Sequence, residues 1–479
     1  MAEAALPAGR GWLRRKPIEA AEGQDAGAGR TLRKSLSWPH LVALGVGAIV
    51  GTGIYTLIGQ GADRAGPAVI LSFAIAGVVC ACAALAYAEM ATLIPASGSA
   101  YTYTYAAIGE TLAWIVGWSL ILEYTVVCST VAVGWSGYAA GFLRSAGVAL
   151  PAALTAGPLD GGLVNLPAVL ITLVVAGVLA AGTRESATIN FLLVLVKIAA
   201  LAVFVAIALP HFQIKNFQPF MPYGFVSHDD HGVQRGVMGA AALIFFAFYG
   251  FDAVSTAAEE AKNPGRDLTI GIVGSMLACT LLYMLIAAAA LGALRFDLFA
   301  KSGEPLALVL RSLGQDRAAQ AIAAAAVVAL PTVILAFMFG QSRIFFVMAR
   351  DGLLPRGLAA VNSRTGTPVA MTLVTGVVVA VVAGVFRLGQ IAEVANSGTL
   401  AAFVAVSASL LVLRVRDPDR PRVFRTPLAW VVAPLAIAGC LYLFASLAPL
   451  TQKAFLIWNA LGVVVYLLYG RRSSALAKA

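Results

Sequence analysis

The sequence predicts an all-α membrane protein with twelve transmembrane helices. The chain is 60% hydrophobic and 12% charged, with a mean hydropathy of +0.87. A soluble domain of this composition would lack the polar surface that must face water. The apolar runs have about the 20 residues that a spanning helix needs. Because hydrocarbon offers no partner for unpaired backbone groups, we expect each run to form a closed helix.

The predicted spans begin at His40 and are joined by polar connectors. They cover residues 40–62, 67–93, 108–143, 163–181, 187–210, 236–259, 268–294, 316–349, 368–386, 389–413, 428–447 and 452–470. The polar, Gly/Ala-rich residues 1–38 are expected to form a disordered cytosolic tail. A transmembrane domain over 39–470 follows, and 471–479 form a second cytosolic tail. Within the domain, two five-helix sets cover about 40–210 and 236–413, and two extra helices lie within 428–470.

The distribution of basic residues predicts the orientation in the membrane. With twelve spans both termini lie on one side, and that side holds 21 of the 33 Lys and Arg residues, against 10 in the opposite connectors. Cytosolic loops carry an excess of basic residues, so both termini are expected in the cytosol, with the protein in the inner (plasma) membrane. This rule also accounts for the net charge of +10, and we expect no nucleic-acid partner.

The cysteine and histidine patterns do not predict a metal site, a cofactor or catalysis. All five cysteines lie in apolar runs, and the four histidines lie at span ends or in the loop before the sixth span. A thiol in such a run is a small core side chain, and the sequence offers no clear nucleophile–base set. A channel would need a line of polar residues along one span, and none is present.

Two predicted spans carry glycine in the middle, where a continuous helix would avoid it. The first span has four glycines in the ten residues from Leu44 to Gly53, and the sixth contains Tyr249-Gly250-Phe251-Asp252. These two spans open the two five-helix sets, so the glycines occupy matching positions. Paired interrupted helices at matching positions indicate the binding site of a secondary transporter.

An interrupted helix frees backbone groups that suit both ends of an amino acid. A carboxylate fits the N-terminus of the second half-helix, where N–H groups and the helix dipole favour an anion. An ammonium group fits the freed carbonyl oxygens. The alternative is close packing of small residues, as in Gly47-xxx-Gly51. On the transport interpretation, the substrate backbone binds Ile49, Gly51, Thr52, Gly53, Phe246 and Tyr249.

Three ionisable residues lie deep within predicted spans: Lys197, Glu123 and Asp252. A charge at the bilayer centre costs about 2.5–3.5 kcal/mol on insertion scales, so such side chains usually face the protein interior. A buried lysine gives up its proton more readily than an exposed one, which makes Lys197 the candidate for proton coupling. The alternative is a static cation that holds helix ends through carbonyl contacts. Glu123 and Asp252 are candidate gate or substrate acids, and Asp252 could instead close the break in its own helix.

Two further groups lie near predicted helix ends. The run Tyr101-Thr102-Tyr103-Thr104-Tyr105 precedes the third span, and we expect it at the membrane interface as part of an aromatic belt. Glu89, Glu259 and Glu260 lie near cytosolic helix ends, and we interpret them as helix caps or gate partners.

Four sequence runs are informative when they are taken together. They are Gly47-Ala48-Ile49-Val50-Gly51-Thr52-Gly53-Ile54, Ser97-Gly98-Ser99-Ala100-Tyr101-Thr102-Tyr103, Phe248 to Thr256 with Glu259 to Pro264, and Arg343 to Gly352. Together they resemble the amino acid–polyamine–organocation superfamily, and most of all the bacterial members of its cationic amino acid transporter branch. The similarity covers roughly residues 35–470.

The resemblance implies the leucine-transporter fold, with two inverted five-helix repeats and the substrate between the broken helices. It also implies proton-coupled uptake, because Lys197 falls where proton-coupled members have a lysine in the fifth helix. Its amine would replace the sodium ion of related transporters. Tyr249 stands where smaller aliphatic residues are common, which bears on substrate size. From its position in the eighth span, Met338 is expected to line the far end of the pocket.

The sequence therefore predicts a permease that imports L-amino acids with protons by alternating access. The alternative is an exchanger of cationic amino acids or polyamines. The expected partners are an amino-acid substrate, protons and the lipid bilayer. The sequence identifies no partner subunit and implies no cofactor.

Overall fold

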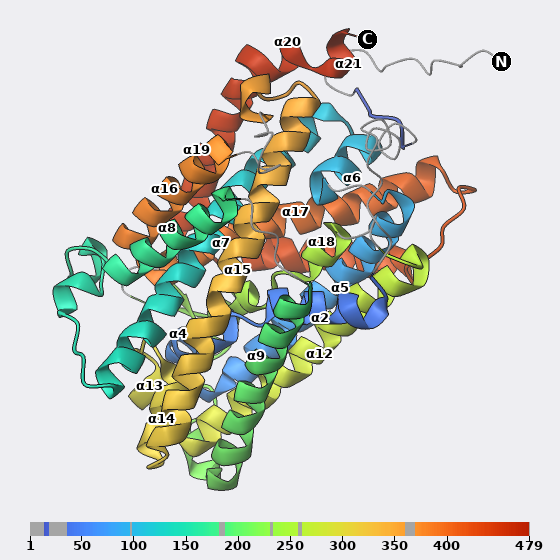
Figure 1. Ribbon diagram of the computed structural model, residues 1–479. Coiled ribbons are helices and arrows are strands. Elements are labelled where there is room, and N and C mark those ends of the chain that lie inside the picture. Colours follow the sequence, from blue (N-terminus) through green and yellow to red (C-terminus); the bar gives the residue numbers. More distant parts are fainter. Residues whose placement is uncertain are drawn as a thin grey trace.

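The protein is almost entirely helical. The computed structural model describes residues 14–18, 36–95, 98–181, 187–229, 233–256, 261–359 and 369–478. Figure 1 shows these residues as a single bundle of helices. Within this part of the chain, the only strands are the short antiparallel pair β1 (Ser227–His228) and β2 (Gln234–Arg235). The mainly α-helical fold that the sequence predicts is confirmed.

Seven helical segments of the described chain are long and apolar enough to cross a membrane. They contain all or most of α4 (Leu57–Ala65) with α5 (Val69–Leu93), α7 (Glu110–Ser145), α9 (Ala187–Ala208), α12 (Pro264–Ala293), α15 (Asp316–Arg350), α17 (Leu388–Arg416) and α19 (Pro449–Val465). The shorter apolar helices are α2 (Trp38–Ile49), α8 (Leu166–Ala180), α10 (Gly236–Ile244) with the 3₁₀ turn after it, α16 (Val369–Val385) and α18 (Ala429–Ala445).

The outer helices of the bundle expose large apolar side chains. Leu170 on α8, Val378 on α16, Leu435 on α18 and Leu456 on α19 are all exposed. Soluble monomers rarely expose large apolar patches. Lipid is the surrounding that suits this surface, as the composition predicts.

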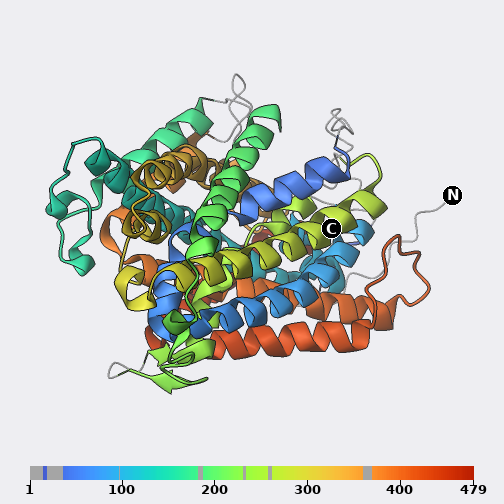
Figure 2. The same ribbon diagram turned by 90° about the horizontal axis from the view of Figure 1, so that it is seen from below.

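The interrupted helices lie at the centre of the bundle. α7 packs along α15 and α17, and α12 packs along both α5 and α2. α8 and α16 pack on each other, and the connector between α7 and α8 projects from one side (Figures 1 and 2). The short helix that continues α2 contacts α7, and α10 contacts α4 and α5. Long, continuous helices therefore enclose the broken ones and hold them in position.

The described parts of both chain ends meet at one end of the bundle. The N–H of Glu110 donates to the Arg14 carbonyl oxygen at 2.8 Å, and the Ser474 hydroxyl donates to Glu110 at 2.5 Å. Helices α20 (Arg471–Ser473) and α21 (Ala475–Lys478) lie at this end, near α6 (Ser99–Ala107) (Figure 1). The disorder predicted for residues 1–38 therefore needs correction at residues 14–18, which form specific contacts. The described part of the predicted second tail, residues 471–478, is mainly helical. Residues 1–13 and 19–35 lie outside the described part.

The aromatic-belt interpretation of the tyrosine run is wrong. Tyr101, Tyr103 and Tyr105 on α6 are at most 1% exposed, because α6 packs between α7 and α17. The hydroxyls of Tyr101 and Tyr105 donate to buried carboxylates, those of Asp351 and Glu110. These tyrosines belong to the protein interior and join α6 to its neighbours.

Glu89 on α5 is a buried ion-pair partner. Its carboxylate lies 2.7 Å from Arg414 Nη2 and 3.0 Å from Arg422 Nε, and it accepts a hydrogen bond from the N–H of Thr426 at 2.7 Å. Glu89 thus fixes the connector between α17 and α18. The other two acids interpreted as caps or gate partners, Glu259 and Glu260, lie outside the described residues.

Candidate substrate site

The first interruption separates α2 from α3 (Thr52–Tyr55). Val50 and Gly51 are extended, with φ/ψ of −74°/97° and −151°/−148°, so the helix stops at Ile49 and restarts at Thr52. The first N–H groups of a helix have no acceptor within that helix, which leaves those of Thr52 and Gly53 directed out of the break. The Thr52 hydroxyl is buried and has no hydrogen-bond partner among the described residues.

The second interruption separates α10 from α11 (Phe251–Thr256). A 3₁₀ turn over Phe245–Phe248 leads into extended Tyr249 and then into Gly250. Gly250 has φ of +109°, a backbone conformation that glycine adopts readily and other residues rarely do. Gly51, Gly53 and Gly250 therefore lie at the observed breaks, whereas Gly45 and Gly47 lie within α2.

The two breaks pack directly against each other through glycine. A Cβ atom on Gly53 would lie 2.3 Å from Ala247 Cα, and one on Gly250 would lie 2.7 Å from the carbonyl carbon of Ala48. Each break therefore needs a residue without a side chain where it meets the backbone of the other. This mutual contact brings the freed backbone groups of both helices to one place.

A small cavity lies between the two breaks, α7 and α15. Its volume is about 10 Å³, roughly the space of one water molecule. All six residues predicted to bind the substrate backbone line it. The full lining is Ala48, Ile49, Gly51, Thr52, Gly53, Val127, Val131, Phe246, Tyr249, Val333 and Phe337.

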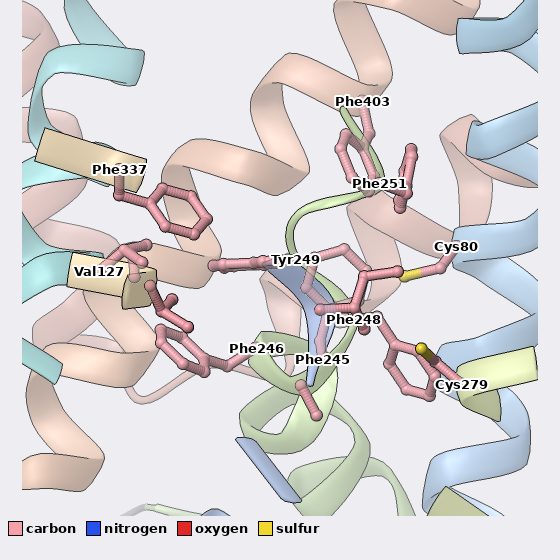
Figure 3. Packing of buried hydrophobic residues seen from close by; sticks show 14 of the residues in the cluster. Cys80, Val127, Phe245, Phe246, Phe248, Tyr249, Phe251, Cys279, Phe337 and Phe403 are labelled. Carbon is pink, nitrogen blue, oxygen red and sulfur yellow. The ribbon is translucent and has the colours of Figure 1, made fainter. Parts of the chain in front are cut away.

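The far end of the cavity is closed by apolar side chains. Figure 3 shows the side chains of Val127, Phe246, Tyr249 and Phe337 converging. Val127 comes from α7 and Phe337 from α15, while Phe246 and Tyr249 both belong to the second break. The prediction for Met338 needs correction, because this residue is buried but does not line the cavity. It follows Phe337, so it lies about 100° further round α15.

Tyr249 is held in place by α17. Its hydroxyl donates to the Asn396 side-chain oxygen, and the Asn396 amide donates to the carbonyl oxygens of Ala242 and Leu243 at 2.6 and 3.0 Å. Ala242 and Leu243 belong to the last turn of α10. The Asn396 side chain therefore supplies hydrogen-bond partners for two carbonyl oxygens at the end of α10 and also positions the Tyr249 ring.

Lys197 on α9 bridges two walls of the site. Its ammonium donates to the Gly47 carbonyl oxygen at 2.9 Å and to the Thr332 hydroxyl at 3.3 Å, and the residue is 1% exposed. Gly47 belongs to the last turn of α2, and Thr332 belongs to α15. Lys197 does not line the cavity. These contacts suit both earlier interpretations, a proton-coupling group and a static cation that holds a helix end.

The amino acid permease family pattern matches residues 36–468. The chain belongs to the amino acid permease family. It is 45% identical over 451 residues to the branched-chain amino acid permease BcaP of Bacillus subtilis, covering 93% of this chain and 95% of that protein. It is 40% identical over 469 residues to the methylthioribose transporter of the same organism, covering 97% and 99%.

The permease also resembles plant proteins. It is 38% identical over 416 residues to the vacuolar cationic amino acid transporter 2 of Arabidopsis thaliana, covering 86% of this chain and 64% of that protein. The predicted resemblance to the cationic amino acid transporter branch is therefore confirmed. The permease is an integral membrane protein, as its apolar helices indicate.

Two intramembrane acids of the permease lie near the site without lining it. Glu123 on α7 and Asp252 on α11 are 2% and 7% exposed, and they are close enough to interact electrostatically. The Oε2 atom of Glu123 has no hydrogen-bond partner among the described residues. Two buried acids near the break supply a place where a proton or a cationic group could be held.

Sequence reasoning missed the residues that shape the side-chain end of the permease site. Val127, Val131, Val333 and Phe337 are ordinary apolar residues in long apolar helices. No local pattern distinguishes them from lipid-facing or core residues, because only the packing of α7 and α15 against the breaks selects them. Asn396 did carry a signal, since an amide inside an apolar span must find hydrogen-bond partners.

Proposed function

We propose that this permease imports neutral, apolar L-amino acids together with protons by alternating access. The observation that carries this proposal is the cavity between two facing helix breaks, where backbone groups form one end and valine and phenylalanine side chains form the other. An amino acid with an apolar side chain has matching chemistry at both ends.

The backbone end would hold the substrate zwitterion. The N–H groups of Thr52 and Gly53 and the Thr52 hydroxyl suit the carboxylate, because they lie at the start of a half-helix. Carbonyl oxygens before each break suit the ammonium group. One of them, on Ile49, accepts a hydrogen bond from the Tyr283 hydroxyl at 2.8 Å, which the ammonium group could join or replace.

The side-chain end favours apolar substrates over cationic ones. Among the described residues, no charged side chain lines the cavity, and an unpaired cation there would be costly to bury. The similarity to BcaP, a branched-chain amino acid permease, is consistent with such a lining. The alternative, an exchanger of cationic amino acids or polyamines, would need a carboxylate at this end.

Substrate entry requires side-chain and helix movement. A cavity of about 10 Å³ is far smaller than an amino acid, so Phe246, Tyr249 and Phe337 must separate before a substrate can enter. Transporters of this type expose a fixed central site to one side of the membrane at a time. A closed centre between two solvent-facing states fits that cycle.

Lys197 is the proposed site of proton coupling. Its ammonium joins α2 to α15 beside the site, and hydrogen bonds from a charged donor are stronger than neutral ones. Proton loss would weaken the connection between two walls of the cavity. Glu123 and Asp252 are proposed as acids that gate the site or accept protons during the cycle.

The proposed architecture is the leucine-transporter fold, with twelve transmembrane helices and two inverted five-helix repeats. The protein would lie in the plasma membrane with both termini in the cytosol. The seven long and five shorter apolar helices support this architecture. So does the meeting of both chain ends at one end of the bundle.

A thermal-shift screen of the purified protein tests the substrate class. The screen uses twenty amino acids, putrescine, spermidine and methylthioribose, because a ligand stabilises the folded state in proportion to the logarithm of its concentration over Kd. We expect leucine, isoleucine and valine to raise the unfolding temperature, and lysine and arginine to have no effect. Stabilisation by lysine or a polyamine alone would favour the exchanger, and counterflow without a proton gradient would then identify it.

A further inference from the structure

The connector between α12 and α15 lies at the end of the bundle opposite to the described parts of both chain ends (Figure 1). It contains α13 (Phe296–Phe299) and α14 (Pro305–Ser312). An open cavity of about 440 Å³ lies between this connector and the last turns of α7. We call it the connector cavity. It shares no lining residue with the cavity between the helix breaks.

Glycines on α7 bring its last turns against the connector. A Cβ atom on Gly137 would lie 2.5 Å from the Gly303 carbonyl oxygen, and one on Gly141 would overlap the Glu304 carboxylate. On its other side, α14 packs on α15 and α9. The walls of the connector cavity are therefore held by close packing of helices and backbone, and not by the long side chains that line it.

The lining of the connector cavity carries more positive than negative charge. Arg144, Lys301 and Arg311 line it together with one acid, Glu304. Arg311 pairs with Glu304, and their side chains are 27% and 9% exposed. The side chains of Arg144 and Lys301 are exposed and form no hydrogen bond or ion pair with any described residue. Because like charges repel, an anion between these cations is favoured.

Glu304 shapes one wall of the cavity. Its Oε1 atom accepts a hydrogen bond from Arg311 Nη2, which fixes the guanidinium and leaves its other N–H groups to bind a ligand. Its Oε2 atom is buried against α7 without a hydrogen-bond partner in the described chain. The N–H of Glu304 donates to the Ser302 hydroxyl at 3.1 Å, so the hydrogen of that hydroxyl can be donated to a ligand.

These donors suit an oxyanion of the phosphate class. Arginine offers planar N–H groups and lysine a point charge, and both side chains recognise phosphate in proteins. The cationic groups come from three separate segments, namely the end of α7, the connector and α14, so they can surround an anion that has several oxygens. Leu298, which is 61% exposed, adds an apolar edge, and the volume leaves room for the glycerol of a lipid headgroup.

The position of the connector cavity is open to phosphate from two sources. α7 has 36 residues, a length of about 54 Å, whereas the hydrocarbon core of a bilayer is only about 30 Å thick. The end of α7 that borders the cavity therefore extends beyond the hydrocarbon. Both lipid headgroups and ions from the aqueous phase can reach this level.

We propose that the connector cavity binds a phosphate group between Arg144, Lys301 and Arg311, either the phosphate of an anionic phospholipid headgroup or a free phosphate ion. A phosphate bound there joins the end of α7 to the connector and, through α14, to α15. It therefore stabilises the folded protein. The site is separate from the proposed substrate site, so this inference does not depend on which substrate is carried or on proton coupling.

Unfolding temperatures of the purified permease in a neutral detergent test the site. The protein is titrated at constant ionic strength with sodium phosphate, with dihexanoyl phosphatidylglycerol below its critical micelle concentration, or with sodium acetate as the control anion. A ligand that binds the folded state raises the unfolding temperature. Stabilisation by both phosphate compounds shows that free phosphate is sufficient, and stabilisation by the lipid alone identifies a headgroup site.

Two substitutions locate the binding. Arg144→Gln and Lys301→Gln should each weaken the apparent affinity about tenfold, because each removes a charge-assisted hydrogen bond. Arg317→Gln and Lys215→Gln, at exposed cationic residues that do not line the cavity, are the matched controls and should bind like the parent. Each variant is compared with its own unfolding temperature without ligand. If Arg144→Gln does not purify in folded form, Lys301→Gln decides in the same way.

The absence of stabilisation by either phosphate compound would overturn the site. Identical titration curves for the parent, Arg144→Gln and Lys301→Gln would show an adventitious ion only and would also overturn it. Equal stabilisation by acetate would contradict the assignment to phosphate. The screen for the substrate class uses none of these ligands or variants, so its failure and the failure of this site are separate results.

Discussion

The Lys197 ammonium donates a hydrogen bond to the Gly47 carbonyl oxygen, 2.9 Å away. Gly47 lies two residues before the end of α2, so this bond holds the half-helix that leads into the first break. The second bond of the same ammonium, to Thr332, reaches the opposite wall. A single titratable group therefore connects the two sides of the proposed substrate site.

Lys197→Ala should abolish uptake driven by a pH gradient and leave substrate binding within about tenfold of the parent protein, because the residue does not line the cavity. The measurement is leucine uptake in proteoliposomes with an inward proton gradient, paired with binding to the purified variant. Lys262→Ala, at an exposed lysine, is the control. Unchanged gradient-driven uptake in Lys197→Ala would contradict the assigned role.

Gly53→Ala should destabilise the permease by about 1–3 kcal/mol, as overpacking of a filled interior does. The new Cβ would meet Ala247 Cα at 2.3 Å, which forces the two breaks apart. Thermal unfolding of purified protein measures the loss. Gly177→Ala is the matched control, because no atom lies within 4 Å of its new Cβ. Equal unfolding temperatures for both variants would show that the breaks are not tightly packed.

Phe337→Ala should shift selectivity toward larger apolar substrates. Removing the ring enlarges the side-chain end of the cavity. Valine should therefore bind about tenfold more weakly, and the affinity for phenylalanine should rise relative to the affinity for valine. Competition against labelled leucine measures the ratio. Met338→Ala changes the neighbouring residue of α15, which does not line the cavity, and should leave the ratio unchanged. A shift in Met338→Ala of the same size would place the pocket elsewhere.

Glu304, in the connector before α14 (Pro305–Ser312), should make stability depend on pH. Burial raises the pKa of the Glu304 carboxyl, although Arg311 and Arg144 oppose the shift. The folded state then binds this proton more tightly than the unfolded state. Protonated Glu304 therefore stabilises the folded state fully below the ordinary glutamate pKa of about 4.3. This contribution is lost as pH rises through the pKa of Glu304 in the folded protein.

Unfolding temperatures of the parent and Glu304→Gln between pH 4 and 7 test this sign. The parent should lose stability relative to the variant as pH rises. The ion pair with Arg311 requires an ionised Glu304, so its contribution is already included in the folded pKa and in the slope. Asp297→Asn, at an exposed acid paired with Arg295, serves as the control. Parallel curves for the parent and Glu304→Gln would contradict the prediction.

Residue pattern alone predicted the parts of the fold that depend on local chemistry. The apolar runs predicted the helices, and the glycines at 51, 53 and 250 predicted where two of them break. Six cavity residues followed from the same glycines, because a break frees backbone groups wherever it occurs. These features need no knowledge of which helices are neighbours.

Features that depend on tertiary packing were missed or misplaced. The lysine at 16 looked like part of a polar tail, and only the fold brings it to Asp351. The tyrosines of α6 resembled an interface belt, but α7 and α17 cover them. Met338 was predicted to line the cavity, whereas its neighbour Phe337 does, because the rotation of α15 about its axis cannot be read from a run that is apolar on most sides.

The binding of leucine and two truncated analogues to the purified permease tests the central claim most directly. Leucinamide lacks the carboxylate, and 4-methylpentanoate lacks the ammonium group, while both keep the side chain. If the two breaks grip both ends of the amino acid backbone, each analogue should bind about 100-fold more weakly than leucine or worse, because buried polar groups would lose their partners. Affinities within a few-fold of leucine for either analogue would contradict recognition by the broken helices.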